Sequence, residues 1–127
     1  MTYELSRKSR DKLKGVHPDL IKVIETAITD APVPFVIVEG LRSLDRQKQL
    51  VAKGASRTLN SRHLTGHAVD IAPLVDGEVR WDWPLYDKLG PHIENIAALL
   101  NIPIEWGGRW AKFPDGPHFE LDRKTYH

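Results

Sequence analysis

The stretch SRHLTGHAVDIAP, residues 61–73, joins a cluster of polar side chains directly to an apolar segment. Residues 69–81 then alternate between apolar and polar on both sides of Asp76-Gly77, a dipeptide that favours a tight turn between antiparallel strands. The stretch therefore predicts a β-hairpin whose first strand begins beside side chains able to bind a metal ion.

The segments around this hairpin predict helices and further strands. Helical spacing of apolar residues, capping residues and β-branched runs predict helices over residues 17–31, 43–54 and 84–100, and strands over residues 33–40, 102–106 and 117–121. Gly90-Pro91 is expected to break or kink the third helix, because proline lacks the backbone donor. Together these elements predict one α+β domain over residues 1–127, with helices packed on a mainly antiparallel sheet.

The composition excludes several kinds of site and partner. The chain has no cysteine, so it has no disulfide, thiolate zinc site, iron–sulfur cluster or cysteine nucleophile. Any bound metal must therefore use His, Asp or Glu. With 18 basic and 17 acidic residues, the net charge supports neither nucleic-acid nor membrane binding by a global field.

Two features of the N-terminal region bear on location and partners. The basic run RKSRDKLK, residues 7–14, is interpreted as a solvated helix face, and weak docking on an anionic polymer is the alternative. The chain has no apolar stretch of the roughly 18 residues that a membrane span needs, and its first residues lack the apolar core of a signal peptide. We therefore expect synthesis in the cytoplasm and release by another component.

Two separate segments supply candidate metal ligands. His63 and Asp70 are seven residues apart, and Gly66 between them permits a turn that brings both side chains to one point. Asp115 precedes His118 by three residues near the end of the chain. Two histidines and one aspartate leave a fourth tetrahedral position open, as a hydrolytic zinc requires. Asp115 then supplies a nearby carboxylate that need not be a ligand.

Other polar residues have competing interpretations. His67 follows His63 by four residues, the spacing of two ligands on a helix, but Gly66 disfavours a helix there. His67 is therefore kept as a substitute ligand. Arg42 follows the predicted strand that ends at Gly40, where it is either an anion-binding residue or a surface charge.

Four tryptophans are clustered in the second half of the chain. Trp81, Trp83, Trp106 and Trp110 are interpreted as core or sheet-face residues. Trp106 and Trp110 are also candidates for the wall of a peptide-binding groove.

The residues Ser61, His63, Gly66, Ala68 and Asp70 spell S-x-H-x-x-G-x-A-x-D, which resembles the signature of the LAS-type zinc peptidases of the M15 family. That family groups D-alanyl-D-alanine carboxypeptidases, D-alanyl-D-alanine dipeptidases of vancomycin resistance and L-alanyl-D-glutamate endopeptidases, many of them phage endolysins. The resemblance is closest to the endopeptidases and covers most of the chain through the motifs GVHPDL, VEGLRSLDRQKQLVAKGAS, SRHLTGHAVDIAP, WGGRW and DGPHFEL. It implies the fold shared by hedgehog domains and D-Ala-D-Ala peptidases.

The resemblance also implies a role for each matching residue. It implies zinc ligands at His63, Asp70 and His118. Asp115 would be the general base, and an aspartate rather than a glutamate there is similar to the L-alanyl-D-glutamate branch. Arg42 would stabilise the oxyanion of the tetrahedral intermediate, and Ser61 would support the site or the substrate. One departure is Arg109, where many relatives carry an acidic residue, and it bears on which bond is cleaved.

The expected function is therefore that of a zinc-dependent peptidoglycan hydrolase, an endolysin that cleaves the L-alanyl-D-glutamate bond of the stem peptide. We expect a monomer with no nucleic-acid partner and no stable membrane association. It would act on the periplasmic peptidoglycan of a Gram-negative host after a holin opens the membrane. The alternatives are a D-alanyl-D-alanine carboxypeptidase, which Asp115 disfavours, and a zinc-containing wall-binding module without activity, which Arg42 and Asp115 together disfavour. The third alternative is a basic anion-binding protein, and it is based on the basic run at residues 7–14.

Overall fold

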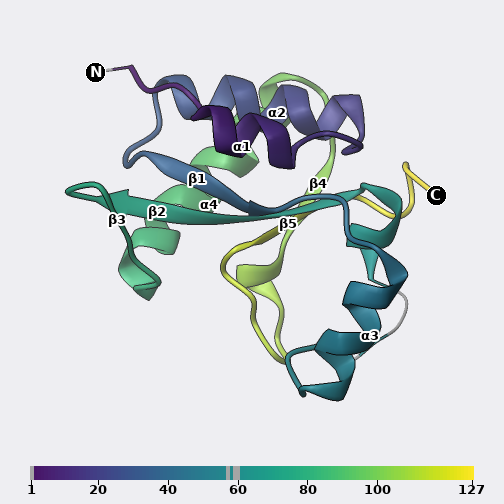
Figure 1. The fold of residues 1–127 in the computed structure, drawn as a ribbon. Coiled ribbons are helices and arrows are strands. Elements are labelled where there is room, and N and C mark those ends of the chain that lie inside the picture. The colour runs from purple at the N-terminus through teal and green to yellow at the C-terminus, as the bar shows by residue number, and fades with distance from the viewer. Residues whose placement is uncertain (1, 57, 59–60) are drawn as a thin grey trace.

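The computed structural model describes residues 2–56, 58 and 61–127, and its centre is an antiparallel sheet (Figure 1). The strands are β1 (Phe35–Glu39), β2 (Ala68–Val75), β3 (Glu78–Val79), β4 (Ile104–Trp106) and β5 (His118–Leu121). They are ordered β1-β2-β5-β4, and β3 pairs with the far end of β2. Every pairing is antiparallel, which confirms the predicted sheet type.

Helices flank the sheet in the order that the sequence predicts. The helical segments are α1 (Arg7–Lys12), α2 (Pro18–Thr29), α3 (Leu44–Ala52) and α4 (Trp83–Leu99), with short 3-10 turns η1 (Arg62–Thr65) and η2 (Gly107–Arg109). In Figure 1, α1 and α2 lie above the sheet, whereas α3 lies beyond one end of it. Within the described residues, no helix is both long and apolar enough to cross a membrane.

The core lies between the sheet and the apolar face of α2. Leu20, Val23 and Ile24 are fully buried on that face, as the helical spacing of residues 17–31 predicts. From the sheet, Ile71 and Phe119 are also fully buried. Each buried aliphatic side chain of this size contributes about 1.5–3 kcal/mol, so this packing fixes β2 and β5 firmly. Two of the predicted metal ligands, Asp70 and His118, lie on these strands.

The hairpin predicted after β2 is present but short. Asp76 and Gly77 adopt φ values of 53° and 78°, the left-handed pair that a type I′ turn requires. The second strand, β3, has only two residues, pairing Leu74 with Val79 and Val75 with Glu78.

Gly90-Pro91 was predicted to break or kink the third helix, and the break does not occur, because α4 continues through both residues as one helix. Leu89 and Ile93 are fully buried on either side of the proline, so tertiary packing offsets the roughly 3 kcal/mol that an interior proline costs. Gly90 has a packing reason of its own: an added Cβ would lie 2.4 Å from the ring of Trp106. The glycine allows this indole to pack against the helix.

The four tryptophans were predicted to be core or sheet-face residues, and this holds for only some of them. Trp106 is 5% exposed, but Trp81 and Trp83 are 55% and 46% exposed. The two exposed indoles occupy the connection after β3 and the first residue of α4.

The basic run at residues 7–14 forms α1 and the turn that follows it. Ser9 is buried and its hydroxyl accepts a hydrogen bond from the backbone N–H of Ile37, which ties α1 to β1. Lys12 donates to the backbone carbonyl of Val38. The helix therefore has a structural face toward the sheet, with Lys8 on its exposed side.

Candidate active site

Two adjacent strands and one turn bring the three predicted metal ligands together. Asp70 on β2 and His118 on β5 are directly paired across the sheet, and His63 lies in η1, just before β2. The chain reverses at Gly66, which has φ +75°, and an added Cβ there would lie 2.3 Å from the carbonyl oxygen of Gly15. Only glycine fits both the backbone conformation and the space. The turn that the sequence predicts is therefore confirmed.

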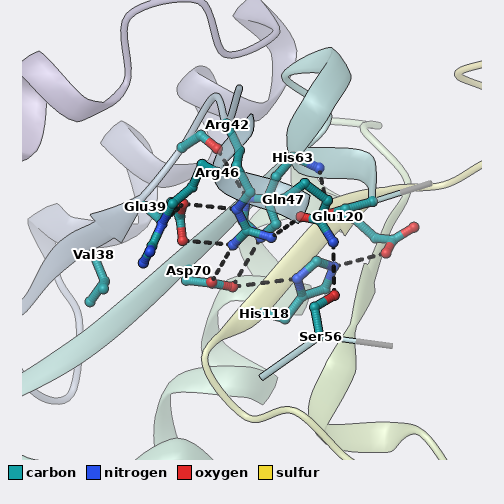
Figure 2. Close-up of polar contacts among 12 residues, drawn as sticks. Val38, Glu39, Arg42, Arg46, Gln47, Ser56, His63, Asp70, His118 and Glu120 are labelled. Atoms are coloured by element: carbon teal, nitrogen blue, oxygen red, sulfur yellow. Dashed lines mark hydrogen bonds and ion pairs between the residues drawn. The ribbon is translucent and has the colours of Figure 1, made fainter. Parts of the chain in front are cut away.

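The three side chains converge on one point, as Figure 2 shows for His63, Asp70 and His118. Their ligand atoms all lie within 4.8 Å of one another. His63 Nε2 is 3.3 Å and His118 Nδ1 is 3.4 Å from the same oxygen, Asp70 Oδ1. That oxygen is buried and has no hydrogen-bond partner among the described residues. A buried carboxylate oxygen facing two imidazole nitrogens fits a bound cation, and this donor set suits zinc.

Each histidine is oriented by an acceptor on its other ring nitrogen. His63 Nδ1 lies 2.9 Å from the carbonyl oxygen of Gly40, and His118 Nε2 lies 2.8 Å from Glu120 Oε1. When these nitrogens carry the proton, His63 Nε2 and His118 Nδ1 have lone pairs free for a metal. Sequence reasoning missed Glu120. Strand alternation offered a signal, because residues two apart on a strand point to the same face.

The charges of this cluster hold a proton where a metal would bind. Burial by itself raises the pKa of Asp70, but the two imidazoles of His118 and His63 beside it outweigh burial and hold the pKa below its ordinary value. Burial by itself lowers the pKa of His118, but the carboxylates of Asp70 and Glu120 outweigh it and raise the pKa to about 9. A metal ion must therefore displace the His118 proton on binding.

Arg42 lies against this cluster in a fixed orientation (Figure 2). Its Nε and Nη2 donate to the two carboxylate oxygens of Glu39 at 2.8 and 2.6 Å, and its Nη1 donates to Gln47 Oε1 at 2.7 Å. Nη2 is also 3.7 Å from Asp70 Oδ2. The backbone N–H of Arg42 donates to the carbonyl oxygen of His63, so the two segments are connected directly. The surface-charge interpretation of Arg42 is wrong.

Glu39 and Gln47 were also missed by sequence reasoning. Gln47 is fully buried on α3 and its amide nitrogen donates to Ser56 Oγ at 2.8 Å. A glutamine in an otherwise solvated helix has no sequence signal of burial. Glu39 is the last residue of β1 and directly precedes Gly40. This position at the end of a predicted strand was the sequence feature that could have indicated a role in the site.

Asp115 lies in the segment between η2 and β5, and its side chain lines the same cavity as the metal cluster. Its backbone N–H donates to the carbonyl oxygen of Gly107 at 2.8 Å, and its own carbonyl accepts from the N–H of His118 at 3.2 Å. This tight turn places Asp115 beside the cluster. Burial, reinforced by the charge of Asp70, raises the pKa of Asp115. The carboxylate is thus a better proton acceptor than an exposed aspartate.

The cavity has a volume of about 1100 Å³, and all five principal candidates line it. They are Arg42, His63, Asp70, Asp115 and His118. Ser61 also lines it, and its hydroxyl accepts from the backbone N–H of His63 at 3.2 Å, which caps η1. The ring of Trp110 lies on the cavity wall, 5.1 Å from that of His118.

Trp106 does not have its predicted place on the groove wall. It lies in the core, with its ring stacked on Phe119 at a centroid distance of 6.1 Å. Its Nε1 donates to the carbonyl oxygen of Gly116 at 2.8 Å. The indole therefore supports the Asp115 turn from behind, because β4 alternation directs it inward.

Two further residues lie outside the cavity. His67 is not part of the metal group: its Nδ1 lies 2.6 Å from Thr65 Oγ1, and its ring lies 5.6 Å from that of His17. The substitute-ligand prediction is therefore wrong, because the His67 ring, just before β2, lies against Thr65 and His17 and not against Asp70. Arg109 pairs through two nitrogens with Glu94, each at 2.7 Å, and does not line the cavity.

A His-Asp-His group with an adjacent carboxylate and guanidinium on one cavity wall defines a metal-dependent hydrolase. The family model described as phage L-alanyl-D-glutamate peptidase matches residues 1–127, and the chain belongs to that family. The predicted family and the predicted enzyme class are therefore confirmed.

Individual relatives agree with this assignment. The L-alanyl-D-glutamate peptidase of Escherichia phage T5 is 32% identical over 130 residues, which cover 99% of this chain and 94% of the phage protein. The crystal structure of the Serratia marcescens L-Ala D-Glu endopeptidase ChiX matches with a TM-score of 0.92 and 44% identity, covering 98% of this chain and 94% of ChiX.

A more distant match extends the fold comparison. The vancomycin-resistance D,D-pentapeptidase VanY has a TM-score of 0.54 at 18% identity, covering 95% of this chain and 78% of VanY. At this identity the match concerns the fold alone, and it confirms the predicted D-Ala-D-Ala peptidase-like architecture.

Proposed function

We propose that the protein is a zinc peptidase that hydrolyses the L-alanyl-D-glutamate bond of peptidoglycan. The observation that carries the proposal is the convergence of His63, Asp70 and His118 in one cavity with Asp115. The names of the phage T5 relative and of ChiX supply the bond. Zinc bound by the three ligands would polarise the scissile carbonyl and lower the pKa of a water molecule to about 7.

Asp115 is the proposed general base. Its carboxylate accepts a proton from the attacking water and then donates it to the nitrogen of the leaving D-glutamyl residue. The raised pKa of Asp115 suits both steps. A carboxylate whose pKa is shifted toward neutral pH accepts a proton more readily than an ordinary aspartate and can still release it. The turn closed by Gly107 and His118 holds the carboxylate at the cavity while leaving its oxygens available for the proton transfer.

Arg42 is the proposed stabiliser of the negative charge that develops on the scissile carbonyl oxygen. A guanidinium has five N–H donors, of which three are used by Glu39 and Gln47. The two that remain are on Nη1 and on Nη2, and Nη2 lies 3.7 Å from Asp70 Oδ2 at the metal group. The partners fix the guanidinium before substrate arrives, and a preorganised donor of this kind is worth about 2.7–4 kcal/mol in the transition state.

The setting of the reaction is also part of the proposal. The protein would act as a monomeric endolysin, reaching periplasmic peptidoglycan after a holin opens the membrane. The phage origin of the T5 relative supports the endolysin part of this setting. Host cells that express the protein should lyse only when a holin is expressed with it. Lysis of cells that express the protein without a holin would contradict this setting.

Mass spectrometry of fragments from purified peptidoglycan tests the reaction. The wild type should release peptides whose new N-terminus is D-glutamate, and Asp115→Asn should release almost none. Loss of a terminal D-alanine alone would identify a carboxypeptidase instead. A zinc-loaded protein that binds peptidoglycan and cuts nothing would identify a binding module.

A further inference from the structure

The cavity wall carries more positive charge than the proposed mechanism uses. Within the described residues, four cationic side chains line it: Arg42, Arg62, Lys112 and Arg123. A substrate with a free carboxylate would be recognised by a cation whose charge is not already paired.

Two of the four are fixed by the protein itself. Arg42 is held by the carboxylate and amide oxygens described above. Arg62 is mostly buried, and its Nη2 donates to the carbonyl oxygens of Leu121 and Tyr126 at 3.1 and 2.8 Å. Arg62 thus ties the end of the chain to η1, and its Nε lies 3.8 Å from Glu120 Oε2, so its charge is paired within the protein.

The remaining two differ in their pairing. Arg123 donates from Nε to Glu120 Oε2 at 3.1 Å, so its guanidinium has an ion-pair partner. Lys112 is exposed on the cavity wall, and no hydrogen bond or ion pair joins its ammonium to any residue that the structure describes. Among the described cations of the cavity, Lys112 alone has an uncommitted charge.

The proposed substrate has a free carboxylate on the leaving-group side of the scissile bond. A glutamyl residue has two carboxyl groups and uses only one to join the next residue, so the other stays negatively charged at neutral pH. In the proposed reaction this residue carries the leaving nitrogen, to which Asp115 returns a proton. Its free carboxylate therefore lies on the Asp115 side of the scissile bond. Lys112 belongs to the same loop, three positions before Asp115.

We propose that Lys112 binds the free carboxylate of the substrate's D-glutamyl residue and so selects for glutamate at the position after the scissile bond. This inference rests on the proposed function. The flexible stem of a lysine suits a carboxylate that is delivered with the substrate, since the ammonium needs no fixed partner beforehand.

Two matched peptides test the assignment: one with a free carboxylate on the D-glutamyl residue and one with a carboxamide in its place. The wild type should prefer the carboxylate peptide. Lys112→Gln should raise KM for that peptide about two- to fivefold, as expected for an exposed charge pair, with kcat nearly unchanged. The carboxamide peptide should be cleaved equally well by both proteins, and Lys112→Arg should restore the preference.

Lys88→Gln is the matched control, because Lys88 is an exposed lysine on α4 that does not line the cavity. It should keep the wild-type preference. A Lys112→Gln enzyme that still prefers the carboxylate peptide overturns the assignment. Loss of the preference in Arg123→Gln alone would also overturn it, in favour of Arg123. If the wild type cleaves neither peptide at the L-alanyl-D-glutamate bond, the proposed function itself fails and the role of Lys112 fails with it.

Discussion

Replacing Glu120 by glutamine should weaken zinc binding while leaving the fold intact. Glu120 is 1% exposed and does not belong to the metal group, but its Oε1 lies 2.8 Å from His118 Nε2. Its other oxygen accepts from Arg123 at 3.1 Å and lies 3.8 Å from Arg62 Nε. Glutamine has the same shape, so the substitution removes charge with little change in packing.

The size of the effect follows from these contacts. The amide oxygen of glutamine still accepts from His118, but a neutral acceptor makes a hydrogen bond about half as strong as a charged one. The carboxylate at position 120 no longer raises the basicity of His118, so its other nitrogen becomes a weaker ligand. Loss of such a partner weakens metal binding about 10–100-fold, or about 1.4–2.8 kcal/mol.

Competition with a chelator of known zinc affinity, measured over a range of pH and extrapolated to the deprotonated site, measures this change without the opposing loss of proton competition at His118. Glu78→Gln is the control, because Glu78 is an exposed carboxylate on β3 remote from the metal group. It should bind zinc as the wild type does. A Glu120→Gln protein with the zinc Kd of the wild type, within about twofold, would refute the argument that Glu120 tunes His118.

Three further outcomes follow from the site. Asp115→Asn should retain zinc but lower kcat by about 10²–10⁴-fold. Metal analysis checks the zinc content and single-turnover kinetics checks the rate. Turnover near the wild-type rate would place the base elsewhere. Arg42→Ala should lower kcat about 10²–10³-fold with a smaller change in KM, whereas a change in KM alone would make Arg42 a substrate-binding residue. Because the pKa of His118 is raised to about 9, zinc must displace its proton at pH 7, and the apparent affinity should fall about tenfold per pH unit as the pH drops below 9. Chelator competition between pH 6 and 8 measures that slope, and a flat profile would contradict it.

The sequence predicted the elements of the fold where local chemistry decides them. Asp76-Gly77 specifies a turn by itself, and the apolar spacing of residues 17–31 specifies a buried helix face. The course of α4 could not be predicted in this way. It continues through Pro91 where Leu89 and Ile93 are buried and where Gly90 packs against Trp106, which follows in sequence only after the helix has ended, on β4.

In the candidate site too, features set by local sequence were predicted and features set by long-range contacts were not. Gly66 predicted a turn beside His63, and the structure confirms that this turn brings His63 to Asp70. The groups that surround the ligands were not predicted, because Glu120 and Gln47 act through burial and long-range contacts that sequence spacing does not record. Which residues bind zinc and which transfer protons remain predictions that the variants above test.

The central claim is that one zinc ion on this His-Asp-His group drives cleavage of the L-alanyl-D-glutamate bond. The most direct test removes metal from the purified protein, adds zinc back in steps, and follows release of peptides with an N-terminal D-glutamate from peptidoglycan by mass spectrometry. Activity should be absent without metal and should reach its maximum at one zinc per chain. Cleavage of that bond by the metal-free protein, or a different cleaved bond at full zinc occupancy, would contradict the account.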